Sequence, residues 1–181
     1  MSGIRCTVLI IMKEKSMKRY NVRMLTVLGL LIALEIILSR FCSISAWNIK
    51  IGFNFIPVVI VALLYGPLTA GIAAGLADFL GAVLFPIGMY FPGFTVTAFL
   101  TGAVYGIFLY KQQNSFRIFC AVLFSQLVFS LCLNTLWISI LYDSPYLPLL
   151  ATRAVQCIAA GLIRFVVISI LIRGVGVYIE S

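Results

Sequence analysis

Few residues in this sequence could carry out acid–base chemistry. It contains five Asp and Glu residues and no His, and of the carboxylates only Glu35 and Asp78 fall inside long apolar segments. An ionisable group at membrane depth is costly, so each is a functional candidate. Arg164 lies at a similar depth within the last apolar segment. The three side chains predict a structural ion pair or a polar brace between helices, and a proton relay is the alternative interpretation.

A second set of polar residues is of the kind that binds a small molecule. Its cations are Arg40, Lys50 and Arg153, and such groups capture carboxylates. Aromatic side chains stack against flat rings, and amides recognise the donors and acceptors at a ring edge. The aromatic and amide candidates are Trp47, Asn54, Tyr90, Phe91, Asn134, Trp137 and Gln156. This set predicts a site for a planar, polar, anionic molecule, and the alternative is an interfacial belt of aromatic and basic side chains.

Other chemistry finds little support in the sequence. The five cysteines are scattered without a CxxC pair, and there is no His to complete a metal site. No P-loop motif GxxxxGK[ST] is present, so this chain does not hydrolyse ATP through one. We therefore expect no metal, no cofactor and no enzymatic activity in this chain, and an intramembrane enzyme ranks last among the alternatives.

The composition places these residues in a membrane. Of the 181 residues, 63% are hydrophobic and only 10% are charged. A soluble domain has about 25% charged residues, so this chain is predicted to be an integral protein of the lipid bilayer. The net charge of +8 then reflects the sorting of basic residues across the membrane, and we expect no nucleic acid as a partner.

Six apolar segments predict an all-α bundle of six transmembrane helices. Their expected bounds are 22–41, 51–65, 68–84, 94–110, 117–141 and 152–172. We expect irregular backbone at 42–52 and at 85–93, on the same side of the membrane. The predicted organisation is a basic N-terminal segment over 1–21, a membrane domain over 22–173 and a short tail over 174–181. Met12 and Met17 are both plausible starts, so the first residues are a possible over-extension.

The basic residues predict the orientation of this bundle. Nine Lys and Arg residues fall on the side of the two termini, and only Arg40, Lys50 and Arg153 fall on the other side. Because cytoplasmic segments carry the excess of Lys and Arg, we expect both termini in the cytoplasm. The three exceptions then face the outside of a bacterial plasma membrane, where a substrate arrives.

Gly29 and Ala33 form a small-xxx-small pair in the first predicted helix. Small residues at this spacing let two helix backbones approach closely in lipid. The pair predicts either packing within the bundle or a docking face for a partner helix.

Several runs resemble the substrate-binding S components of energy-coupling factor (ECF) transporters, and their folate branch in particular. They cover about residues 20–173 and include Gly52-Phe53-Asn54-Phe55-Ile56-Pro57, Leu64-Tyr65-Gly66-Pro67-Leu68, Ala77-Asp78-Phe79-Leu80-Gly81, Gly88-Met89-Tyr90-Phe91-Pro92-Gly93 and Leu133-Asn134-Thr135-Leu136-Trp137. The resemblance implies a six-helix subunit that binds a vitamin from outside, most simply folate. In this family a second basic residue often follows the Arg that matches Arg153, whereas this chain has Gln156.

The resemblance also implies partners. They are a transmembrane scaffold (T) subunit and two ATPase (A) subunits, which supply the energy, and the scaffold would meet the first helix at Gly29 and Ala33. The alternatives are an S component for another vitamin or precursor and a stand-alone small-molecule channel or exporter.

Overall fold

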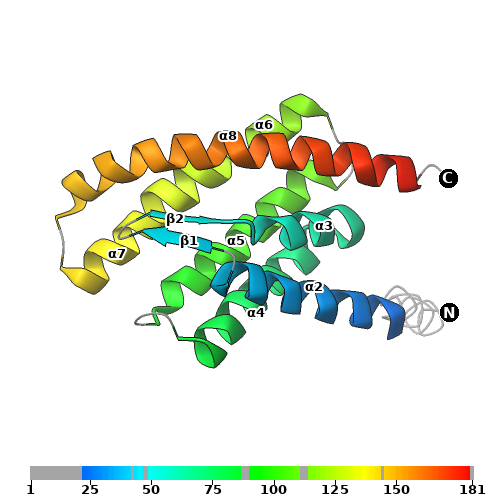
Figure 1. Cartoon of the computed structure of the whole chain (residues 1–181), viewed down its shortest axis with the longest axis horizontal. Helices are drawn as coiled ribbons and strands as arrows, with labels where there is room; N and C mark the ends of the chain where they lie inside the picture. Colours follow the sequence, from blue (N-terminus) through cyan, green and yellow to red (C-terminus); the bar gives the residue numbers. More distant parts are fainter. Residues whose placement is uncertain are drawn as a thin grey trace, which may run out of the picture. The chain divides into compact units, whose positions relative to one another are not determined.

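The computed structural model describes residues 22–41, 43–46, 49–86, 90–110, 114–143 and 145–179. The chain divides into two units, Met1–Leu30 and Leu31–Ser181, and the first supplies only the beginning of helix α2 to the described residues. The packing described below is that of the second unit. Its elements follow the order α2 (Val22–Arg40), β1 (Ser43–Ala46), β2 (Ile49–Gly52), α3 (Phe55–Tyr65), α4 (Pro67–Leu84), α5 (Pro92–Leu109), α6 (Ser115–Phe124), η1 (Ser125–Leu133), α7 (Asn134–Tyr142) and α8 (Tyr146–Ile179) (Figure 1).

The helices agree with the prediction of a helical membrane protein. Because α6, the π-helix η1 and α7 continue into one another, the described residues form six continuous helical stretches. Four of these are long and apolar enough to cross a membrane: Pro67–Leu84, Pro92–Leu109, Ser115–Tyr142 and Tyr146–Gly174. Helix α3 is apolar but shorter.

Several predicted boundaries were wrong. The second helix begins at Phe55 instead of residue 51, because Ile51 and Gly52 belong to strand β2, and the last helix ends at Ile179 instead of residue 172. The segment 42–52, expected to be irregular, contains an antiparallel hairpin in which Ile44 pairs with Ile51 and Ala46 with Ile49. Both short strands alternate polar with apolar residues, the period of a strand. The last helix begins at Tyr146 instead of Thr152, because Pro148 falls in its first turn, where a missing N–H is tolerated.

The predicted breaks elsewhere are confirmed. Helix α4 ends at Leu84 and α5 starts at Pro92, a residue suited to the first turn of a helix. Helices α3 and α4 meet at Gly66, whose φ of 86° lies in the region that favours glycine. Helix α7 ends at Asp143, which adopts a left-handed conformation with φ 49°.

Helices α4 and α5 pack backbone against backbone. A Cβ atom on Gly102 of α5 would lie 2.5 Å from the carbonyl oxygen of Ala70 on α4, and one on Gly106 would collide with Pro67. From the other side, a Cβ atom on Gly71 would lie 3.0 Å from the Phe99 carbonyl oxygen. Such close approach requires small residues, which the glycine- and alanine-rich α4 provides.

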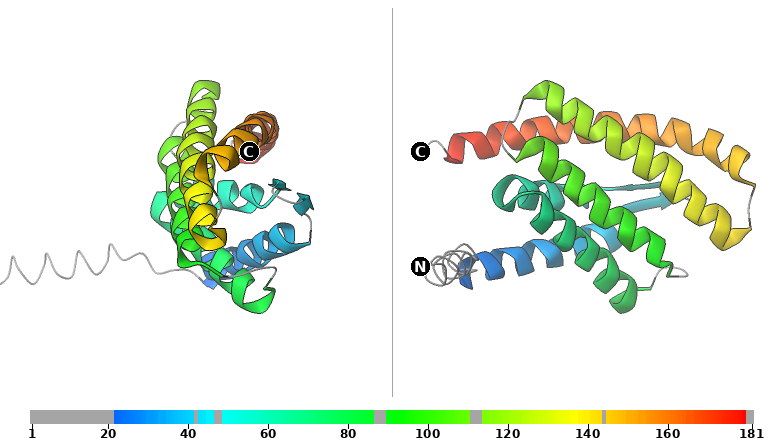
Figure 2. Two further views of the ribbon diagram at one scale, coloured as in Figure 1. Left: turned by 90° about the vertical axis from the view of Figure 1, so that its left-hand side faces the viewer. Right: turned by 180° about the vertical axis from the view of Figure 1, so that it is seen from behind.

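The connections within the second unit gather at two opposite ends. In Figure 1 and in the right-hand view of Figure 2, the β1–β2 hairpin, the α4–α5 connection and the α7–α8 turn lie toward one end. The α3–α4 turn, the α5–α6 connection and the C-terminal part of α8 lie toward the other. Most of the predicted binding residues belong to the first of these ends, which we call the hairpin end.

Candidate functional site

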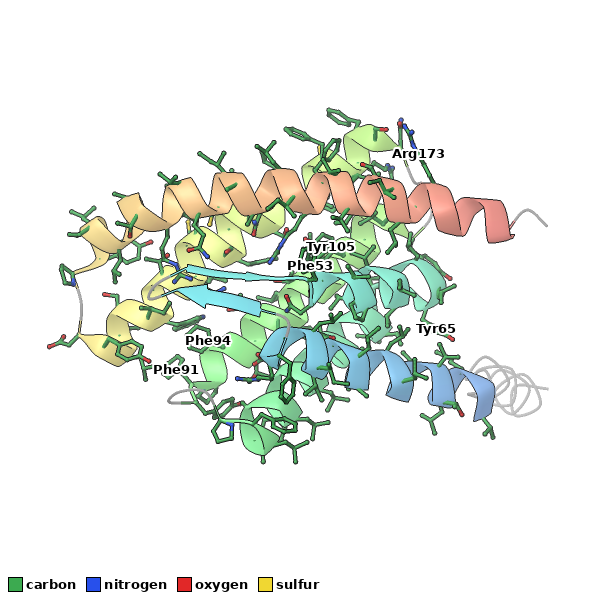
Figure 3. The ribbon with its side chains drawn as sticks, viewed as in Figure 1. Phe53, Tyr65, Phe91, Phe94, Tyr105 and Arg173 are labelled. Carbon is green, nitrogen blue, oxygen red and sulfur yellow. The ribbon has the colours of Figure 1, made fainter. Side chains whose placement is uncertain are left out.

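An aromatic cluster lies where α5 begins. The rings of Phe91 and Trp137 have centroids 5.3 Å apart, and Phe94 adds an edge-to-face contact with Phe91 (Figure 3). A Cβ atom on Gly93 would lie 2.6 Å from Phe91 and 2.7 Å from Trp137, so both rings rest on the glycine backbone. The indole nitrogen of Trp137 donates a hydrogen bond to Thr97 Oγ1 at 3.1 Å. The structure therefore brings two predicted aromatics from different helical segments into one fixed cluster.

Tyr90 belongs to a polar chain beside this cluster. Its hydroxyl lies 3.1 Å from Thr95 Oγ1, which donates to Asp78 Oδ2 at 2.9 Å. The Tyr90 ring also makes an edge-to-face contact with Phe79 of α4, at 6.0 Å between centroids. These contacts connect Tyr90, two residues before α5, to helix α4. They also give the predicted carboxylate Asp78 a hydroxyl partner.

Arg40 ends α2 and lies against α4. A Cβ atom on Gly81 would be 3.2 Å from Arg40 Nε and 3.5 Å from Nη2. The Nε atom is buried and makes no hydrogen bond to any part of the chain that the structure describes. The next residue, Phe41, makes an edge-to-face contact with Phe85 at 5.5 Å, so two successive residues of this segment contact the end of α4.

A polar seam runs between η1 and α8. Gln126 Nε2 donates to the Cys157 carbonyl oxygen at 3.4 Å, and Cys157 Sγ lies 3.6 Å from Ser130 Oγ. A Cβ atom on Gly161 would approach Gln126 Cγ at 3.7 Å. These contacts fix an antiparallel register that, continued by about one turn, brings Asn134 level with Arg153.

The seam carries polar atoms whose hydrogen bonds are not made. Arg153 Nε and Nη1, Asn134 Oδ1 and Gln126 Oε1 are buried and have no partner within the described ranges. The same holds for Thr135 Oγ1, whose side chain is 0% exposed. Buried polar groups are almost always paired, so this concentration makes the seam a candidate ligand site. It combines two kinds of group, a guanidinium that donates and amide or hydroxyl oxygens that accept.

The seam also contains a π-helix, η1, of nine residues. Such segments are rare and are frequent at functional sites. Sequence reasoning missed η1, Gln126, Thr95 and Thr97, because apolar periodicity does not distinguish a π-helix from an α-helix, and threonines in apolar helices are common. A polar residue at the centre of the fifth apolar segment, Gln126, was the available signal.

The structure says less about the surroundings of the remaining predicted ligand-binding residues. Trp47 lies outside the described residues, and Lys50 is in strand β2 with its side chain outside the description. Asn54 is half-buried at the turn that precedes α3, and its side chain does not cap that helix. Gln156 is half-buried on α8, one turn after Arg153.

The predicted ion pair stays a prediction. Glu35 is buried, with 6% of its surface exposed. The Arg164 guanidinium lies 5.3 Å from the centre of the Phe55 ring, a cation–π contact. Asp78 accepts the hydrogen bond from Thr95, and neither of these described contacts joins Arg164 to a carboxylate.

Comparisons with known proteins identify the family. Residues 23–176 match the family model described as the substrate-specific component of ECF transporters. A folate transporter FolT from Clostridium novyi (strain NT) is 41% identical over 141 residues, which cover 77% of this chain and 81% of the relative. A folate transporter FolT from Leuconostoc mesenteroides subsp. mesenteroides is 28% identical over 130 residues, which cover 71% of this chain and 70% of that relative.

Comparison with solved structures leads to the same family. A crystal structure of FolT bound with folic acid superposes with a TM-score of 0.78 and 34% sequence identity, over 82% of this chain and 92% of that one. A biotin-specific S component of an ECF-type ABC transporter gives a TM-score of 0.63 at 21% identity, over 86% and 94% of the two chains, and is similar in fold. These matched proteins are transport components and not enzymes. The chain thus belongs to the family of substrate-specific components of ECF transporters and is a helical membrane protein.

Proposed function

We propose that this chain binds folate from the outside for ATP-driven uptake by partner subunits. The observation that carries this proposal is the similarity to FolT bound with folic acid, at 34% identity over 92% of that chain. The 41% identity to a folate transporter from Clostridium novyi supports the same substrate. Folate has a flat pterin ring with hydrogen-bonding edges and a tail with two carboxylates, so it needs aromatic, amide and cationic contacts.

The hairpin end supplies each of these contacts in our proposal. Phe91, Trp137 and Tyr90 would pack against the pterin ring, together with Trp47. Amides would recognise its edges, from Asn54, Asn134 and Gln156. Arg40, Lys50 and Arg153 would receive the carboxylates, and the buried N–H groups of the two arginines without partners in the described chain support this role.

The proposed topology is six transmembrane spans in a bacterial plasma membrane, with both termini in the cytoplasm. It rests on the excess of Lys and Arg at the termini and on the 111–117 connection. In this orientation the hairpin end faces outward, toward the substrate. No cofactor is needed in this chain, because the energy would come from ATP hydrolysis by the partners.

The proposed partners are a transmembrane T subunit and two ATPase (A) subunits. Gly29 and Ala33 lie one turn apart on α2, and Ala33 is exposed. Small residues at this spacing suit close contact with another helix in lipid, which supports docking of a partner helix there. Co-purification with a scaffold and ATPases would distinguish this proposal from a stand-alone channel or exporter.

A titration of the purified protein in detergent tests the substrate. We expect folate to quench the fluorescence of Trp137 and to bind with a single-site isotherm. The Arg153→Ala variant should bind about tenfold or more weakly, because a hydrogen bond to a charged group contributes about 1.5–3 kcal/mol. A flat response to folates with a clear response to another vitamin would contradict the proposed substrate.

A further inference from the structure

The contact between Arg40 and Gly81 links a predicted ligand-binding cation to a glycine with no assigned role. Gly81 is buried in the last turn of α4. A Cβ atom there would lie 3.2 Å from Arg40 Nε, closer than ordinary van der Waals contact, and 3.5 Å from Nη2. The edge of the guanidinium group therefore lies on the bare backbone of α4, at a point where any other residue would place an atom.

Two further features hold Arg40 at this position. Helix α4 ends at Leu84, and the C-terminal end of a helix carries partial negative charge, which favours a nearby cation. The edge-to-face contact between Phe41 and Phe85, at 5.5 Å, fastens the adjacent residue to the same helix end. The residue after Arg40 is thus held at the same helix end that its guanidinium group contacts.

The hydrogen bonding of Arg40 is incomplete in this arrangement. Its Nε atom is buried and finds no acceptor in the described part of the chain. A guanidinium whose donors are not all satisfied by the described chain is suited to receive an anionic oxygen. An alanine at position 81 would force the group to move by a few tenths of an ångström, and a β-branched residue would displace it.

We propose that Gly81 is a positioning residue for ligand binding: the absence of a side chain at this position gives Arg40 its place in the site, so the size of residue 81 sets the affinity for an anionic ligand. This inference rests on the proposed function, in which Arg40 receives a carboxylate of folate. It differs from a packing role, because the effect of residue 81 is exerted through Arg40.

A double-mutant cycle tests the inference. Folate dissociation constants are measured by isothermal titration calorimetry for Gly81→Ala, Gly81→Val and Arg40→Ala, and for each Gly81 variant combined with Arg40→Ala. We expect Gly81→Val to weaken binding about as much as Arg40→Ala, roughly tenfold or more, and Gly81→Ala to weaken it by less. In the Arg40→Ala background, neither Gly81 substitution should change the dissociation constant further.

Two controls separate positioning from packing. Gly75→Ala lies on the same helix, where a Cβ atom would make an ordinary contact of 3.5 Å with Phe99 Cβ, and it should leave binding unchanged. Folate dimethyl ester, in which both carboxylates are masked, should bind the wild type and Gly81→Val equally. Thermal unfolding of each variant confirms that it is folded.

The outcomes distinguish the inference from the proposed function. If Gly81→Val weakens binding equally with and without Arg40, or weakens binding of folate and its ester equally, residue 81 acts through helix packing and the inference is wrong. If the wild type binds folate and Gly81→Val binds it as tightly, the inference alone is contradicted. A wild type that has no affinity for folate contradicts the proposed function and the inference together.

Discussion

The helices of the α4–α5 interface and those of the η1–α8 interface are held together by different kinds of contact. Helices α4 and α5 meet through glycines whose backbones touch the opposite helix, as at Gly102 and Ala70. Helices η1 and α8 meet through polar side chains, among them Gln126 and Cys157. Polar atoms of this second interface and of the adjoining α7 lack partners within the described chain. The first interface is closely packed within the described chain, whereas the second contains polar atoms without a described partner.

We infer from this difference that the α4–α5 interface contributes mainly to stability and the η1–α8 interface mainly to ligand recognition. Without a hydrophobic force between helices in lipid, close packing of small residues is the main source of stability at α4–α5. Buried polar groups without partners cost free energy, so the second interface is retained at the expense of stability. Substitutions at α4–α5 should therefore reduce stability more than folate binding. Substitutions at η1–α8 should reduce folate binding more than stability.

Among the substitutions compared below, Gly102→Ala has the largest expected effect on stability. The added Cβ atom would lie 2.5 Å from the Ala70 carbonyl oxygen, which belongs to the backbone of helix α4 and cannot turn away as a side chain could. Forced overpacking of this kind costs about 1–3 kcal/mol, so the melting temperature in detergent should fall markedly.

Gly161→Ala is the matched control at the other interface. Its Cβ atom would meet Gln126 Cγ at an ordinary 3.7 Å. Replacing glycine by alanine in a helix favours folding by up to about 1 kcal/mol, so this variant should melt at the same or a higher temperature. Equal destabilisation by the two substitutions would contradict the distinction between the interfaces.

The next prediction, at the η1–α8 interface, is the reverse: folate binding is weakened while stability is kept or raised. Arg153→Met removes a half-buried arginine whose buried Nε and Nη1 atoms have no acceptor among the described residues, and it keeps an unbranched side chain. Replacing a buried charged group by an apolar one is often neutral or stabilising, so we expect an unchanged or higher melting temperature. Folate binding should weaken about tenfold or more in a calorimetric titration.

Arg173→Met serves as the control, because Arg173 is exposed near the C-terminal end of the same helix. It should change neither the melting temperature nor the dissociation constant appreciably. A strong loss of stability in Arg153→Met would show instead that Arg153 is held by contacts within the protein.

The helices of this fold could be predicted from the sequence, since apolar segments and their Gly-Pro breaks are local signals. Gly66 and Pro67 divide α3 from α4, as expected, and α5 begins at Pro92, two residues before its expected start. The hairpin was missed because each of its strands has only four residues, too few for an alternating pattern to stand out. The π-helix was missed because its residues are as apolar as those of the α-helices around it.

The candidate site could be predicted only as a list of residue types. Charge, aromatic character and position relative to the helix ends selected Arg40, Arg153 and Trp137, and the structure places all three toward the hairpin end. Their partners could not be predicted. The contact of Arg40 with Gly81 and the hydrogen bond from Trp137 to Thr97 join residues 41 and 40 positions apart, and only tertiary packing determines such pairs.

The smallest expected effects come from two buried threonines with opposite surroundings. Thr97 Oγ1 donates to the Gly93 carbonyl oxygen and accepts the Trp137 indole N–H, whereas Thr135 Oγ1 has no partner that the structure describes. Thr97→Val should therefore lower the free energy of unfolding by about 1 kcal/mol and weaken folate binding a few-fold, because the Trp137 ring loses its hydrogen bond.

Thr135→Val keeps the shape of the side chain and removes a polar atom without a described partner, so stability should stay the same or rise by up to about 1 kcal/mol. Thermal unfolding and folate titration of both variants measure the difference. If Thr135→Val weakens folate binding without a loss of stability, its hydroxyl belongs to the ligand site.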